Sequence, residues 1–131
     1  MKTNKEKTVI LAIDDDAVQL KVFHNILHNK FDIHEANSAS TALNFLNTHE
    51  TDLILLDIAM PNISGFNFLY DIRTIPSYMT VPIIIVSGKT GHDFFVEAKK
   101  SSAFDVLTKP VDPDLLISTI KKALAAAAVE I

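Results

Sequence analysis

The chain contains no cysteine among its 131 residues. This absence excludes disulfide bonds and thiolate metal sites, and it is typical of proteins from a reducing compartment. Long apolar runs are also missing, since no stretch approaches the roughly 18 uninterrupted apolar residues of a membrane span. The charged start, residues 1–7, leads into an apolar run that is too short for a signal peptide. We therefore expect a cytoplasmic protein that does not associate with a membrane.

An excess of positive charge is missing as well. The chain has 12 Lys and Arg against 16 Asp and Glu, a formal net charge of -4. Such a balance gives no general attraction to nucleic-acid backbones, so we expect no direct nucleic-acid binding. The length and a hydrophobic content of 48% suit one buried core. The expected organisation is a flexible tail over residues 1–7 and a single domain over residues 8–131.

Five short apolar runs alternate with longer segments of helical spacing. This alternation predicts repeated βα units that build a parallel sheet with helices on both faces. The expected strands are residues 8–13, 31–36, 52–56, 81–86 and 104–108. The runs 9–13, 53–56 and 81–86 are apolar without alternation, as strands covered on both faces should be. The expected fold class is therefore α/β, with a doubly wound sheet.

The segments between the runs carry the signals of helices. Apolar stripes mark three of them: Val18, Val22, Phe23, Ile26 and Leu27; Ala42, Leu43, Phe45 and Leu46; Leu116, Ile120 and Leu124. We expect the first two stripes to face the core. Ser38 and Asp112 stand at expected N-cap positions, and Pro113 occupies the first position of the last helix. Further helices are expected over residues 64–75 and 92–100.

Polar residues follow four of the expected strands. The acidic run 14–16 follows the first strand, Asp57 the third, Ser87 the fourth and Lys109 the fifth. Residues just past the carboxyl ends of parallel strands line the ligand crevice of an α/β sheet, so these side chains should meet at one edge. Asp16 is better explained as a helix cap, because acids are favoured at the first turn of a helix.

This set of side chains suits phosphoryl transfer. Converging carboxylates either take up protons or recruit a cation, and oxygen ligands without cysteine favour Mg²⁺ (or Mn²⁺). Asp57 can attack phosphorus while the metal ion and Lys109 neutralise the equatorial oxygens of the transferring group. The Ser87 hydroxyl can donate a hydrogen bond to a phosphoryl oxygen, and it would then sense the phosphorylated state.

Four stretches resemble the receiver domains of two-component response regulators. They are 13–16 (IDDD), 55–61 (LLDIAMP) with Gly65, 85–88 (IVSG) and 109–110 (KP), in the expected order along nearly the whole chain. The resemblance implies a flavodoxin-like (βα)5 fold with strand order 2-1-3-4-5. It also implies that Asp57 accepts a phosphoryl group from a histidine kinase or a histidine phosphotransfer protein. The domain would then signal to a downstream effector protein or domain rather than act as a metabolic enzyme.

The same resemblance implies a metal site and a loop geometry. Asp15, Asp57 and the carbonyl of Ala59 would coordinate Mg²⁺, and Asp14 would act through a metal-bound water. The Lys109–Pro110 peptide bond would be cis, which proline permits at low cost. Met60–Pro61 and Gly65 would shape the loop over the metal, with a positive φ at the glycine.

The chain departs from the receiver pattern at positions linked to output. Val106 stands where receivers usually carry Tyr or Phe, Ser102 where glycine is frequent, and Val111 where an aromatic residue is frequent. The usual aromatic switch is therefore missing at Val106. Output would instead involve the aromatic residues of the last third of the chain: Phe94, Phe95 and Phe104.

Two positions are expected to modulate the lifetime of an acyl phosphate. Ala59 and Lys89 lie two residues beyond Asp57 and Ser87, beside the path of the hydrolysing water. Alanine leaves this path open, whereas the Lys89 ammonium can approach the phosphoryl group.

Alternative functions remain open on the sequence. Asp14, Asp16 and Val18 after the first strand, with 84–88, resemble motifs of haloacid-dehalogenase-type phosphohydrolases, whose nucleophile would be Asp14. A pseudo-receiver, which keeps the fold without phosphorylation, is a third class. His24 and His28 have the i, i+4 spacing of a helical metal site, but no acidic partner pattern accompanies them, and solvated helix histidines explain them better.

Overall fold

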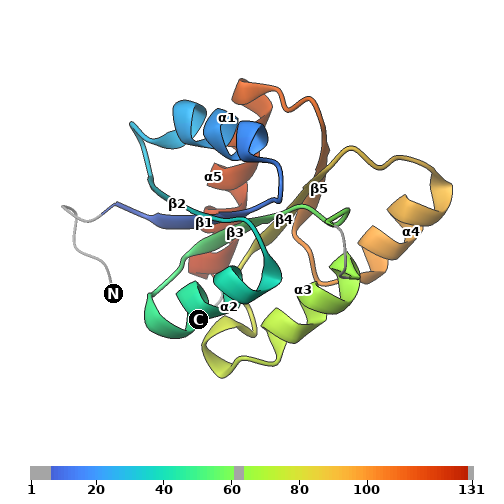
Figure 1. Cartoon of the computed structure of the whole chain (residues 1–131), viewed down its shortest axis with the longest axis horizontal. Helices are drawn as coiled ribbons and strands as arrows, with labels where there is room; N and C mark the ends of the chain where they lie inside the picture. Colours follow the sequence, from blue (N-terminus) through green and yellow to red (C-terminus); the bar gives the residue numbers. More distant parts are fainter. Residues whose placement is uncertain (1–6, 61–63, 130–131) are drawn as a thin grey trace.

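The computed structural model describes residues 7–60 and 64–129 of the chain. A five-stranded parallel sheet has the order β2-β1-β3-β4-β5 (Figure 1). The strands are β1 Val9–Ile13, β2 Asp32–Ala36, β3 Leu53–Leu56, β4 Ile83–Ser87 and β5 Asp105–Thr108. The helices are α1 Ala17–Leu27, α2 Ala39–Thr48, α3 Gly65–Arg73, the short 3-10 helix η1 Pro76–Tyr78, α4 His92–Lys100 and α5 Pro113–Val129. The α/β class and the order 2-1-3-4-5 are confirmed.

The three central strands are buried on both sides. All residues of β3 and β4 are buried, and β1 is buried from Ile10 onward. The edge strands β2 and β5 instead carry exposed charged residues, Asp32, Glu35 and Asp105, as edges that avoid pairing with other chains do. β4 begins two residues later than predicted because Pro82 has no N–H to contribute to the ladder.

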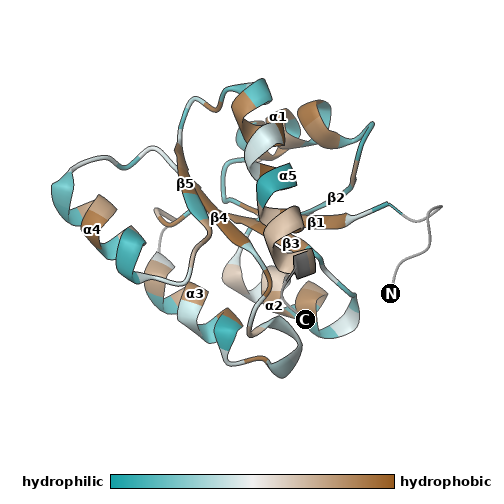
Figure 2. Ribbon diagram, turned by 180° about the vertical axis from the view of Figure 1, so that it is seen from behind, coloured by the Kyte–Doolittle hydropathy of each residue, from teal (hydrophilic) through white to brown (hydrophobic). Residues whose placement is uncertain are grey.

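Helices cover both faces of the sheet, and each face has its own core. α1 and α5 pack on one face around Phe23, Leu116 and Ile120. α2, α3 and α4 pack on the other face around Leu46, Leu69 and Ala98. Figure 2 shows the hydrophobic residues concentrated in the central strands between these two layers. Among the described residues, no helix is long and apolar enough to cross a membrane.

The apolar stripe predicted for α1 was partly wrong. Leu20, Phe23 and Leu27 face the core, whereas Val18 is 72% exposed and Val22 is also exposed. The side-chain oxygen of Asp16 accepts a hydrogen bond from the N–H of Val18, so Asp16 is the N-cap and the helix begins at Ala17. Val18 and Val22 therefore lie on the solvent-facing side of α1.

The predicted helix caps are confirmed. Ser38 caps α2 in a capping box with Thr41, each side chain accepting from the other's N–H. Asp112 accepts from the N–H of Leu115 at 2.9 Å and so caps α5, with Pro113 at the first helical position. α4 spans the predicted residues 92–100. The predicted tail falls largely on residues 1–6, outside the described residues.

Gly65 is required for a reason other than the predicted one. The expectation of a positive φ at Gly65 was wrong, because Gly91 is the glycine with a positive φ among the described residues. A Cβ atom on Gly65 would instead overlap the backbone carbonyl oxygen of Ile58. Glycine therefore lets α3 start directly against the loop that follows β3. Pro61, the other predicted loop residue, lies outside the described residues.

Arg73 connects three loops at the opposite end of α3. Its guanidinium donates to the carbonyls of Tyr78 at 3.1 Å, Val81 at 2.5 Å and Ser102 at 2.9 Å, and to the Ser102 hydroxyl at 2.6 Å. Burial lowers the pKa of Arg73 from its ordinary value. Ser102, which occupies a frequent glycine position, thereby contributes a side-chain bond that glycine could not provide.

Candidate functional site

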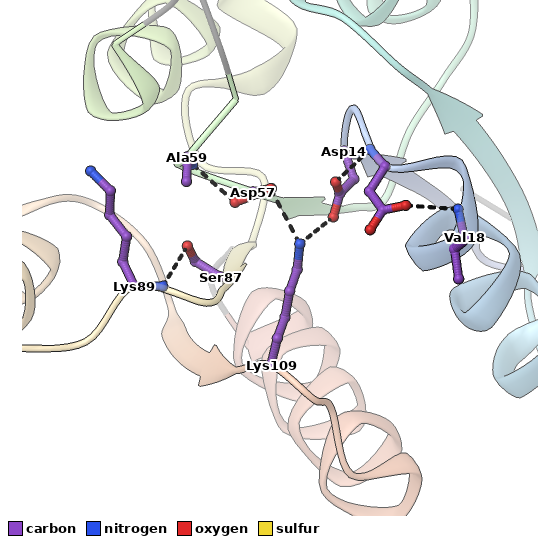
Figure 3. Close-up of polar contacts among 8 residues, drawn as sticks. Asp14, Val18, Asp57, Ala59, Ser87, Lys89 and Lys109 are labelled. Atoms are coloured by element: carbon purple, nitrogen blue, oxygen red, sulfur yellow. Dashed lines mark hydrogen bonds and ion pairs between the residues drawn. The ribbon is translucent and has the colours of Figure 1, made fainter.

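The parallel register brings the strand-end residues together. Ile13 pairs with Leu56, and the N–H of Asp57 donates to the Ile13 carbonyl at 3.0 Å, so Asp14 and Asp57 leave adjacent strands side by side. The N–H of Lys109 donates to the Ser87 carbonyl at 3.0 Å in the same way. The predicted convergence at one edge of the sheet is visible in Figure 3.

Three carboxylates form an acidic cluster at this edge. Asp14, Asp15 and Asp57 each offer an oxygen within 4.8 Å of the others. Asp14 is 0% exposed and Asp57 only 6% exposed, whereas Asp15 faces solvent. Burying like charges this close is costly unless a cation accompanies them.

Lys109 is the protein's own cation in the cluster. Its Nζ lies 2.8 Å from Asp14 Oδ2 and 3.2 Å from Asp57 Oδ2, so it bridges the two buried carboxylates (Figure 3). Burial alone would lower the pKa of Lys109, but the bond to Asp14 and the charges of Asp14 and Asp57 outweigh it, and the pKa is raised. The lysine therefore stays charged.

One ammonium does not balance three carboxylates. Burial raises the pKa of Asp14 and the charge of Asp57 adds to this effect, although Lys109 and the N–H of Asp16 act against it. The raised pKa means that the Asp14 charge is incompletely compensated by the described protein groups. An oxygen-only donor set with surplus negative charge fits a hard divalent cation.

Each buried carboxylate is fixed through both oxygens. Asp57 Oδ1 accepts the N–H of Ala59 at 2.9 Å, and Asp14 Oδ1 accepts the N–H of Asp16 at 2.9 Å. The second oxygen of each carboxylate faces Lys109. Asp16 itself caps α1, as predicted, and its side chain is thereby engaged away from the cluster. The carboxylates are thus held in defined orientations before any ligand binds.

Ser87 ends β4 on the strand next to Asp57. Its side chain is fully buried, and its Oγ accepts the N–H of Lys89 at 3.3 Å. Leu56, just before Asp57, pairs with Ile85, two residues before Ser87. The Ser87 hydroxyl and the Asp57 carboxylate therefore lie at the ends of two adjacent strands. Figure 3 shows the Ser87 side chain beside Asp57 on the same edge.

The predicted modulators border a hollow beside Asp57. Ala59, Lys89 and Phe94 line a hollow of about 430 Å³ between the loop after β3 and α4. The Lys89 and Ala59 side chains are exposed, and neither contributes a side-chain bond to the acidic cluster among the described contacts.

The predicted output residues gather around α4 and β5. Phe94 is half-buried against the core, whereas Phe95 and Phe104 are each 41% exposed. Phe95, Phe104 and the half-buried Val106 line a second hollow of about 380 Å³. Val106, which stands where receivers usually carry Tyr or Phe, was the signal for this hollow in the sequence. The hollow itself forms because residues of α4 and β5 lie side by side.

The geometry speaks against Asp14 as a nucleophile. Asp14 is completely buried, with 0% of its surface exposed. The phosphohydrolase alternative requires this carboxylate to attack a substrate, whereas Asp57 retains some exposure. The Lys109–Pro110 peptide bond is cis, as the resemblance implied.

Comparisons with known proteins show the family of the chain. The family model of the response regulator receiver domain matches residues 10–121. The transcriptional regulatory protein ZraR of Klebsiella oxytoca is 35% identical over 92% of this chain and 27% of its own length. The 3',5'-cyclic-nucleotide phosphodiesterase regA of Dictyostelium discoideum is 32% identical over 90% of this chain and 15% of its own. The chain thus spans about a quarter or less of these curated relatives.

Solved structures share the whole fold. A CheY-like receiver domain protein of Methanospirillum hungatei has a TM-score of 0.87 and 25% identity, covering 96% of this chain and 100% of that one. The chemotaxis protein CheY4 of Vibrio cholerae has a TM-score of 0.84 and 26% identity over 90% of this chain and 99% of its own. Receiver domains are signalling phosphoacceptors rather than conventional enzymes. By family match, relatives and fold, the chain belongs to the response regulator receiver domains of two-component signal transduction.

Proposed function

We propose that Asp57 is the phosphoryl acceptor of this receiver domain. The observation that supports the proposal is the fixed Asp57 carboxylate, held by the N–H of Ala59 on one oxygen and by Lys109 on the other within the acidic cluster. A nucleophile that is oriented before binding loses little entropy on reaching the reactive geometry. The neighbouring ammonium and N–H favour the charge that develops on transfer.

The phosphodonor in this proposal is a phosphohistidine of a histidine kinase or a histidine phosphotransfer protein. An oxygen of Asp57 forms the new O–P bond while the P–N bond to the imidazole breaks, and the departing nitrogen keeps the electron pair. The product is an aspartyl phosphate, and no oxidant or second substrate is needed. Lys109 stays close to the Asp57 oxygen and pairs with the transferred group's negative charge.

The acidic cluster fits Mg²⁺ or Mn²⁺. Asp15, Asp57 and the carbonyl of Ala59 are proposed as direct ligands, with Asp14 acting through a bound water. When bound, the ion neutralises charge on the phosphoryl oxygens. The role of Asp14 then follows from its burial, because its negative charge holds Lys109 in place and adds to the demand for the ion.

Ser87 is the proposed sensor of the phosphoryl group. Its hydroxyl is buried on the strand beside Asp57 and can turn to donate to a phosphoryl oxygen. Because Val106 lacks an aromatic ring, the change at Ser87 is proposed to be transmitted to Phe95 and Phe104 around the α4–β5 hollow. An effector protein or domain would bind at this hollow.

An apolar surface beside the cluster suits the phosphodonor. Val18 is 72% exposed and Leu115 is 51% exposed, and each lies in the first turn of its helix. α1 and α5 pack on the same face of the sheet (Figure 1). Because α1 follows β1 and α5 follows β5, the first turn of each helix lies at the carboxyl edge of the sheet. We expect a cytoplasmic phosphohistidine protein to cover Val18 and Leu115 during transfer.

The experiment is to locate the acyl phosphate. The protein is incubated with Mg²⁺ and a small phosphodonor such as phosphoramidate, reduced with borohydride and digested for mass spectrometry. Label at Asp57, absent from Asp57→Asn and retained in the matched control Asp16→Asn, supports the proposal. Label at Asp14 would identify the hydrolase chemistry instead, and absence of label would identify a pseudo-receiver.

A further inference from the structure

Two histidines form a pair on the outer surface of α1. His24 lies in the last turn of the helix and His28 is its C-cap with a helical backbone conformation. Their rings are 5.1 Å apart between centroids and within 3° of parallel, and both side chains are exposed. The other three histidines differ, since His34 pairs with Asp32, His49 stacks on Phe45, and His92 has no ring contact among the described residues.

One ring of the pair is already oriented by the backbone. His28 Nδ1 lies 3.0 Å from the carbonyl oxygen of His24, and an oxygen of this kind can only accept. The contact therefore requires the proton on Nδ1 and leaves a lone pair on Nε2 of the neutral ring. A hydrogen bond from one ring nitrogen to a backbone carbonyl is the arrangement that orients metal-binding histidines.

The spacing of the pair suits a single ion. Ring nitrogens that share a tetrahedral or octahedral metal ion at about 2.0–2.1 Å each stand about 3–3.5 Å from each other. The stacked, parallel rings do not aim their lone pairs at one point, but rotation of the His24 ring about χ2, a torsion with a broad energy profile, would bring its nitrogen to this separation while His28 keeps its bond to the backbone. Both rings are exposed, so the rotation meets no core packing.

We propose that His24 and His28 chelate a borderline divalent transition-metal ion of the Zn²⁺, Ni²⁺ or Cu²⁺ class. Imidazole nitrogens favour these ions over Mg²⁺, which the carboxylate cluster suits. Solvent completes the coordination, because two protein ligands leave positions open. Lys7 donates to the His28 carbonyl at 3.3 Å, and its exposed charge is screened by solvent.

This site is separate from the acidic cluster. His24 lies eight residues beyond Asp16 on α1, which corresponds to about 12 Å along the helix axis at a rise of about 1.5 Å per residue. The two sites also use different ligand atoms. The inference therefore does not depend on phosphorylation of Asp57, and it adds a second class of cation to the chain.

The test is a titration of Zn²⁺ into the full chain by calorimetry, with saturating Mg²⁺ present. We expect one Zn²⁺ per chain whose affinity falls about tenfold or more in His24→Ala and in His28→Ala, because even the loss of an outer-shell partner costs about 10–100-fold. The matched control His92→Ala removes an exposed helical histidine and should leave the affinity unchanged. Absence of Zn²⁺ binding, or equal affinities in all four proteins, would overturn the inference.

Nuclear magnetic resonance of the histidine rings tests the same inference without a variant. On addition of Zn²⁺ we expect the ring signals of His24 and His28 to shift together while those of His34 and His92 stay in place. Before addition, the neutral form of His28 should carry its proton on Nδ1. Shifts confined to other histidines, or a proton on Nε2 of neutral His28, would contradict the proposed geometry.

Discussion

Removal of the Asp14 charge should stabilise the metal-free protein. Asp14 is 0% exposed, and the single Lys109 ammonium lies between it and Asp57. In Asp14→Asn, Lys109 loses its 2.8 Å bond to Asp14 and pairs with Asp57 alone, while the amide oxygen of Asn can still accept the N–H of Asp16 and the amide N–H groups need other acceptors. The variant thus loses an incompletely compensated buried charge and keeps the loop bond.

The expected gain is about 1–2 kcal/mol, at the lower end of the cost of a buried group whose partners are incomplete. With an unfolding entropy of about 2.1 cal/mol/K per residue, a chain of 131 residues should gain roughly 4–7 °C in Tm. The assay is thermal and urea unfolding followed by circular dichroism, with a chelator present. Asp16→Asn is the matched control, because asparagine also caps helices and the stability should change by less than about 0.5 kcal/mol.

The pH dependence follows from the raised pKa of Asp14. Burial raises this pKa above its unfolded value, so the folded state binds the proton more tightly than the unfolded chain does. The stabilising contribution of protonated Asp14 is fully present below the unfolded pKa and is lost as pH rises through the folded pKa. The advantage of Asp14→Asn should therefore grow with pH across this window. A variant that is less stable than the wild type at neutral pH, or an advantage that shrinks with rising pH, would refute the reasoning.

Three further substitutions test other parts of the structure. Gly65→Ala forces a Cβ into the Ile58 carbonyl and should cost about 3 kcal/mol or more, with loss of phosphorylation at Asp57; a urea midpoint equal to that of the wild type would contradict the close contact. Arg73→Ala removes the bonds to three carbonyls and should cost about 2–4 kcal/mol in urea unfolding, with a smaller loss in Arg73→Lys; equal losses in both variants would show that the planar fork rather than the charge matters, and an unchanged urea midpoint in Arg73→Ala would contradict the stabilising role. Lys89→Ala should change the lifetime of the aspartyl phosphate, measured as the loss of label over time, and an unchanged decay would remove Lys89 as a modulator.

Much of the fold was predictable because its signals are local. The central strands are continuous apolar runs, and four of the five strands begin one residue after the predicted start. Ser38 and Asp112 cap the helices that they were predicted to cap, because an N-cap is a bond between residues two or three apart. The strand-end positions of the site residues followed from the same runs, since parallel strands end at a common edge.

Other features depend on contacts that no local pattern contains. The exposed side of α1 was misassigned because Val18 and Leu20 are equally apolar, and only the packing of α1 against α5 and the sheet selects Leu20 for the core. The need for Gly65 likewise comes from the approach of Ile58 and not from its own φ angle.

The sequence by itself determined the α/β class, the strand-end residues and the family resemblance, because these follow from the order and periodicity of side chains along the chain. Tertiary structure alone decided that Lys109 bridges Asp14 and Asp57, partners 95 and 52 residues away. It also decided that one ammonium contacts two of three clustered carboxylates and that Asp14 is the carboxylate without exposure. Burial and charge balance are sums over neighbours from several elements, so they exist only once the sheet has brought those elements together.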